Sequence, residues 1–75
     1  MIYTVVGYDK DNDVYIPFEC TQYEDKAKKI ADYFLELIKK GELRNEENDG
    51  EPIDCVFIFA DWGTDSERMV DVYEL

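Results

Sequence analysis

The stretch that decides the fold is TQYEDKAKKIADYFLELIKKG, residues 21–41. Thr21 and Glu24 have the spacing of a capping box at a helix N-terminus, and Gly41 is a frequent residue just beyond a helix C-terminus. The sequence therefore predicts one amphipathic helix over residues 22–40. Its apolar stripe, at helical spacing, consists of Tyr23, Ala27, Ile30, Ala31, Phe34, Leu37 and Ile38.

Two strands are predicted before this helix. Residues 2–8 are β-branched and aromatic, and residues 14–19 return after a turn at residues 9–13 that is rich in Asp and Asn. Pro17 has no N–H to donate to a neighbouring strand, so the second strand is expected at a sheet edge. We therefore expect a hairpin on the N-terminal side of the helix.

Two more strands are predicted after the helix. Residues 41–52 show no apolar periodicity, which predicts a flexible acidic loop. Residues 53–60 are apolar on both faces after Asp54, as is typical of a central strand, and residues 61–67 form a loop before the last strand at 68–74. The order is ββαββ. We expect a single α+β domain, in which one helix packs on one face of a four-stranded mixed or antiparallel sheet.

One face of that sheet is expected to stay uncovered, because the sequence predicts no second helix. Alternate side chains of a strand point to opposite faces. With one choice of pleat register the uncovered face presents Tyr3, Val5, Tyr15, Met69, Asp71 and Tyr73, and the opposite register would turn these residues inward. Adjacent tyrosines on such a face would favour a homodimer or a partner interface.

The charge of the chain is uneven. Nineteen acidic residues and eight basic ones give a formal net charge of −11. Residues 22–40 hold five bases and four acids, a net charge of +1, whereas residues 41–75 hold eleven acids and two bases, a net charge of −9. Residues 1–21, with four acids and one base, carry −3. The excess negative charge is therefore expected on the strands and loops, away from the helix.

A strongly acidic surface attracts basic proteins through long-range electrostatics. Basic surfaces most often bind nucleic acid, and spaced carboxylates can occupy such a surface in place of phosphates. In size and composition the chain resembles the small acidic DNA-mimic inhibitors that phages use against restriction or CRISPR nucleases. The resemblance implies an inhibitor or regulator whose partner is a nucleic-acid-binding enzyme, whereas like-charge repulsion argues against direct contact with nucleic acid or anionic membrane. The alternative is an interaction module or homodimer that uses the uncovered face, with the charge only solubilising.

The predicted partner-binding residues are mostly loop carboxylates. Trp62 stands in the second hairpin loop near Asp61, Asp65 and Glu67, where it would either cover the edge of the core or anchor a partner. The acidic run at residues 42–51 would serve either as a linker or as a negative flap that orders on a partner. The full set is Asp9, Asp11, Asp13, Glu42, Glu46, Glu47, Asp49, Glu51, Asp61, Trp62, Asp65, Glu67, Asp71 and Tyr73.

The sequence offers little for metal binding or catalysis. An Asp-x-Asp-x-Asp run at residues 9–13 resembles the start of a calcium loop, but Val14 stands where that loop requires Gly and Cys20 where it requires Glu. A solvated turn is therefore expected. The chain has no His, and its single serine, Ser66, lacks a nucleophile-elbow context. We expect no catalytic residue, no metal and no cofactor.

The remaining expectation concerns cellular location. No signal-peptide pattern follows Met1, and no apolar run approaches the roughly 20 residues that a membrane span needs. Cys20 and Cys55 lie far apart in the sequence, so we expect both to be reduced, buried side chains and not a disulfide. These features favour a cytoplasmic protein, in the host cytoplasm if a phage encodes it.

Overall fold

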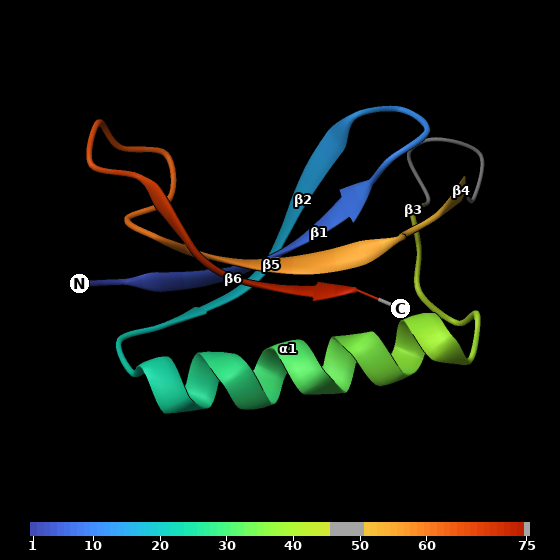
Figure 1. Cartoon of the computed structure of the whole chain (residues 1–75), viewed down its shortest axis with the longest axis horizontal. Coiled ribbons are helices and arrows are strands. Elements are labelled where there is room, and N and C mark those ends of the chain that lie inside the picture. The colour runs from blue at the N-terminus through green and yellow to red at the C-terminus, as the bar shows by residue number, and fades with distance from the viewer. Residues whose placement is uncertain (46–50, 75) are drawn as a thin grey trace.

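In a computed structural model of the chain, the backbone is described for residues 1–45 and 51–74, and side chains for residues 1–43 and 53–74. One helix lies along one face of the main sheet (Figure 1), which confirms the predicted ββαββ α+β fold. The elements are β1 (Tyr3–Asp9), β2 (Val14–Thr21), α1 (Glu24–Lys39), β3 (Arg44–Asn45), β4 (Glu51–Pro52), β5 (Cys55–Ala60) and β6 (Arg68–Glu74). Among the described residues, no helix is long and apolar enough to cross a membrane.

The main sheet has four antiparallel strands in the order β2-β1-β5-β6. β1 and β2 form the first hairpin, β5 and β6 form the second, and β1 pairs with β5 between them. β2 therefore lies at an edge, as Pro17 predicts, and β5 is central, as its apolar residues on both faces predict. The chain passes from β2 to β5 through α1, which packs against strands of both hairpins.

The core lies between α1 and the sheet, and its fully buried side chains are aliphatic. Ala27 and Ala31 are one helical turn apart and 0% exposed, and their small side chains let the helix approach the strands closely. β-Branched side chains of the two central strands pack against them. The buried cluster consists of Val5, Ala27, Ala31, Ile38, Ile53, Val56 and Ile58.

The C-terminal end of α1 agrees with the sequence prediction, and the N-terminal end does not. At the C-terminal end Gly41 has a φ of 72°, and the N–H groups of Gly41 and Glu42 donate to carbonyls of the last turn in a Schellman motif. At the N-terminal end Tyr23 is the N-cap, without a side-chain cap hydrogen bond, and is 60% exposed. Thr21 Oγ1 accepts from the Tyr23 N–H at 3.3 Å, so the predicted capping box does not form and the helix begins at Glu24.

The loop predicted at residues 41–52 contains a short two-stranded ladder. Arg44 pairs with Pro52, and Asn45 pairs with Glu51, in a small sheet separate from the main one. A loop without any secondary structure is therefore wrong for this segment. Backbone pairing of so few residues leaves no alternation of apolar and polar side chains, so the sequence carries no signal for it.

The pleat register turns several side chains to the face opposite the predicted one. Tyr3 and Val5 of β1, and Tyr73 of β6, pack against the core on the α1 side, so their assignment to the uncovered face is wrong. Tyr15 and Met69 lie on the uncovered face, as predicted, and are 44% and 55% exposed. We call this uncovered side of the main sheet the open face.

A β-bulge explains the error in β6. The register between β5 and β6 shifts between Ile58 and Phe59, so strict alternation along β6 is broken. Val70 packs against the core, whereas Val72 pairs with Phe57 on the open face. Asp71 pairs with Ile58, a core residue of the α1 side, so it too is absent from the open face.

Candidate functional site

The open face carries five neighbouring aromatic rings, which we call the aromatic cluster: Tyr8, Tyr15, Phe57, Phe59 and Trp62. Tyr15 lies at its centre, and the centroids of the other four rings are 4.7 to 6.1 Å from its own. Because Tyr15 is 44% exposed, the middle of the cluster is open to solvent. An exposed aromatic surface of this kind is typical of binding sites.

The strand register builds the cluster. Tyr8 stands directly opposite Tyr15 across the β1–β2 pair, and their ring centroids are 4.7 Å apart. Phe57 and Phe59 are alternate residues of β5, so both point to the open face, with centroids 5.8 Å apart. Trp62 follows β5 and lies 4.8 Å from Phe59, half-buried on the open face.

Carboxylates stand at both ends of the aromatic cluster. The β1–β2 turn contains Asp11 and Asp13, and the β5–β6 loop contains Asp65 and Glu67, and all four are exposed. Figure 1 shows these two loops projecting from the sheet on the side away from α1, at opposite ends. Glu67 Oε1 accepts from the Gly63 N–H at 2.8 Å, which fixes that carboxylate within its loop.

One hydrogen bond joins the acidic turn to the aromatic cluster. Tyr8 Oη donates to Asp13 Oδ1 at 2.7 Å. This bond, followed by burial and by the negative charge of the same carboxylate, raises the pKa of Tyr8 to about 12. Asp13 adopts a φ of 53°, and the bond fixes its carboxylate beside the rings. Aromatic rings and a negative charge are thus combined at this end of the open face.

Asp9 has a different role from its neighbours in the turn. It is 0% exposed, and its carboxylate accepts from the Asn12 N–H at 3.3 Å and from Asn12 Nδ2 at 2.8 Å. These bonds close the β1–β2 turn on the backbone. Asp9 is therefore structural, and its prediction as a partner-binding residue does not fit its burial.

The other predicted residues are scattered around the sheet. Glu42 is exposed just after α1, and Asp61 and Asp71 are half-buried. Tyr73 packs against the core, where burial, followed by the charges of Asp71 and Asp32, raises its pKa, so it is not an open-face contact. Outside the described residues lie Glu46, Glu47 and Asp49, together with the side chain of Glu51.

Both edges of the main sheet are protected against an added strand. The β2 edge contains Pro17, which has no N–H, and a bulge shifts its register against β1 between Val5 and Val6. The β6 edge also contains a bulge, and Asp71 Oδ1 accepts from the Val72 N–H at 2.9 Å. A partner that binds by strand addition is therefore disfavoured, whereas the open face has no such protection.

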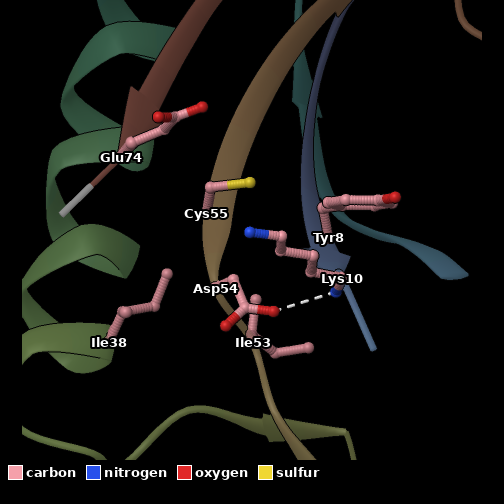
Figure 2. Close-up of a pocket in the computed structure, with 7 residues that line it drawn as sticks. All are labelled: Tyr8, Lys10, Ile38, Ile53, Asp54, Cys55 and Glu74. Atoms are coloured by element: carbon pink, nitrogen blue, oxygen red, sulfur yellow. Dashed lines mark hydrogen bonds between the residues drawn. The ribbon is translucent and has the colours of Figure 1, made fainter. Parts of the chain in front are cut away.

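A hollow of about 500 Å³ lies at the end of the sheet where β1, β5 and the last turn of α1 meet (Figure 2). Asp54 Oδ2 accepts from the Lys10 backbone N–H at 2.9 Å, and the Lys10 side chain extends toward Cys55. The side chain of Lys10 thus occupies the space between the acidic residues of the hollow, Asp54 and Glu74. The hollow is lined by Tyr8, Lys10, Ile38, Ile53, Asp54, Cys55 and Glu74.

Cys55 shows no sign of an activated thiolate. Burial, followed by the negative charges of Glu74 and Asp54, raises the pKa of the Cys55 thiol, so Cys55 is neutral at physiological pH. Both cysteines are free, and Cys55 is buried as predicted, but Cys20 is exposed. Its position near the end of the edge strand β2 leaves Cys20 uncovered. Among the described residues, no group of three or more metal-ligating side chains occurs.

Comparison of the chain with protein-family models, curated proteins and solved structures found no match. Function is therefore inferred from the site itself.

The sequence prediction omitted three cluster members, Tyr8, Phe57 and Phe59. The i, i+2 spacing of Phe57 and Phe59 could have placed both rings on one face of a strand, whereas Tyr8 joins them only through its pairing with Tyr15.

Proposed function

We propose that the protein is an inhibitor or regulator that docks its open face on the nucleic-acid-binding surface of a basic partner protein. Its carboxylates take the place of phosphates, in the manner of a phage anti-restriction or anti-CRISPR protein. The observation that carries this proposal is the exposed aromatic cluster with exposed carboxylates at both of its ends. Electrostatics brings the partner to the surface, and the rings provide the contact area.

The distribution of charge supports this orientation. The helix segment, residues 22–40, has a net charge of only +1 within a chain of net charge −11, and α1 lies on the side opposite the open face. Two acidic loops project toward the open side. A basic protein is therefore attracted more strongly to the open face than to the helix, and the attraction decreases with added salt.

The alternative partner is a second copy of the chain, joined open face to open face. The exposure of Tyr15 and Met69, at 44% and 55%, favours it, since these side chains would be buried in a homodimer. The net charge of −11 on each copy opposes it. Sedimentation at micromolar concentration distinguishes a homodimer from a chain that binds a basic partner. A stable dimer that is insensitive to salt, and that dissociates to monomers in Tyr15→Ala, would support the homodimer and contradict a basic partner.

The test of the main proposal is competition. A protein retained from cells on the immobilised chain is purified, and its binding to the chain is measured with increasing duplex DNA or guide RNA. Mutual exclusion is expected, because carboxylates and phosphates would occupy one surface. A retained protein that binds nucleic acid and this chain together, without mutual weakening, would falsify the proposal.

Two double variants with equal charge change provide the control. Asp11→Lys with Asp65→Lys reverses exposed acids on the open side, and Asp32→Lys with Glu36→Lys reverses exposed acids on α1. The first pair is expected to weaken binding by at least roughly tenfold and to flatten its salt dependence, whereas the second has a small effect. Equal losses in both variants would mean that net charge alone determines binding.

A further inference from the structure

We infer that the aromatic cluster recognises arginine side chains of the partner in preference to lysine. This inference rests on the proposed function and specifies which basic side chains the open face selects. Its structural basis is the exposed ring of Tyr15, surrounded by four tilted aromatic rings and lying near a fixed carboxylate, Asp13.

The geometry suits a guanidinium group. Tyr8 lies 4.7 Å from Tyr15 between ring centroids, and its hydroxyl donates to Asp13 Oδ1 at 2.7 Å. The carboxylate is therefore positioned at the edge of the ring surface. A guanidinium is planar and weakly hydrated, so it can stack on the exposed Tyr15 ring and pair with this carboxylate. An ammonium group is compact and strongly hydrated, and it gains less from the rings.

The cluster has no cation of its own among the described side chains. Their one cation–π contact is on the helix side, where Lys26 Nζ lies 4.9 Å from the centroid of the Tyr23 ring. Lys10, the base closest in sequence to Tyr8, extends into the hollow toward Cys55 (Figure 2). An arginine from a partner therefore meets no competing cation from these side chains on the Tyr15 ring.

The probes are two peptides of equal length and charge, nona-arginine and nona-lysine, titrated into the full chain at about 150 mM salt. Binding is followed by calorimetry and by the fluorescence of Trp62, the only tryptophan in the chain, which lies within the aromatic cluster. Nona-arginine is expected to bind roughly tenfold more tightly than nona-lysine, because several guanidinium–ring contacts add to the shared charge attraction. It is also expected to change the Trp62 signal.

Two tyrosine variants localise the effect. Tyr15→Ala is expected to bring the ratio of the two affinities to within about twofold while leaving nona-lysine binding nearly unchanged, because lysine binding depends on charge. Tyr33→Ala is the control, since Tyr33 is 61% exposed but lies on α1, and it should leave the ratio intact.

The outcomes separate this inference from the proposed function. Equal, salt-dependent affinities for both peptides would overturn arginine recognition and leave a basic partner supported. A preference for nona-arginine that persists in Tyr15→Ala would also overturn it, since the cluster would not be its source. Binding of neither peptide would overturn both proposals.

Discussion

The two faces of the main sheet are built from different side chains. The α1 side buries aliphatic residues such as Val5, Val56 and Ile58, each 0% exposed. The open face instead presents half-buried and exposed aromatic rings beside the buried Val6, with Tyr15 at 44% exposure. Aliphatic side chains between a helix and a sheet stabilise the fold through complete burial. Partly exposed rings retain contact area that a partner can still bury, so the proposed function assigns stability to one face and binding to the other.

Two neighbouring residues of β5 provide the test of this division with the largest expected effect on stability. Ile58 points to the α1 side and Phe59 to the open face. Ile58→Ala is expected to lower the free energy of unfolding by about 2–5 kcal/mol, because it leaves a cavity in a closed core. Phe59→Ala, at a half-buried position, is expected to cost only about 1–2 kcal/mol. Urea denaturation followed by circular dichroism measures both, and a larger loss for Phe59→Ala would contradict the division.

A glycine on the α1 side provides the next test. A Cβ atom added at Gly7 would lie 2.6 Å from Phe18 Cε2 and 3.2 Å from Ile53 Cγ2, and still closer to Phe18 Cζ. The Phe18 ring cannot shift freely, because it stacks on Phe34 with centroids 4.3 Å apart. Gly7→Ala is therefore expected to lower the free energy of unfolding by about 1–3 kcal/mol.

The source of that loss can be checked with a double variant. If the clash with the Phe18 ring is the cause, Gly7→Ala should cost clearly less in a Phe18→Leu background, where the shorter side chain leaves space. Denaturation of the four chains of this cycle gives the coupling energy. Additive effects would show that Gly7 matters for another reason, such as strand pairing.

Element order and several element boundaries could be predicted from the sequence, because local signals specify them. Gly41 ends the helix in a left-handed conformation, and Pro17 marks the edge strand, and both act through their own backbone. The pleat register could not be predicted, because β1 is apolar on both faces, with Val5 and Val6 both 0% exposed. The choice between faces depends on contacts with other strands, such as the ring of Phe18 over Gly7.

The candidate site was only partly predictable for a related reason. Asp9 and Asp11 are chemically identical in the sequence, yet one is buried under the turn and the other is exposed. Folding of the hairpin decides which carboxylate binds the backbone. Composition predicted an acidic, aromatic surface, whereas the grouping of Tyr15 with Phe57 and Trp62 required the strand order and register.

The smallest expected effect on the free energy of unfolding comes from ionisation of Tyr8. The Asp13 hydrogen bond raises the pKa of Tyr8 to about 12, from an unfolded value of about 10. A group with a raised folded pKa stabilises the fold fully below its unfolded pKa, and this contribution disappears as pH rises through the folded value. The free energy of unfolding should therefore fall between about pH 10 and pH 12. Tyr73, on the α1 side, has a pKa raised by burial and adds to this loss.

Asp13→Asn separates the open-face part of this pH dependence from the rest. Asn tolerates the φ of 53° at this position and removes the negative charge, so the Tyr8 phenol should ionise at lower pH. Near-ultraviolet absorbance should show one tyrosine ionising at lower pH in Asp13→Asn than in the wild-type chain, and no such change in Asp11→Asn. An unchanged titration would mean that burial, not the carboxylate, raises the pKa of Tyr8. It would also remove the link between the acidic turn and the aromatic cluster on which arginine recognition depends.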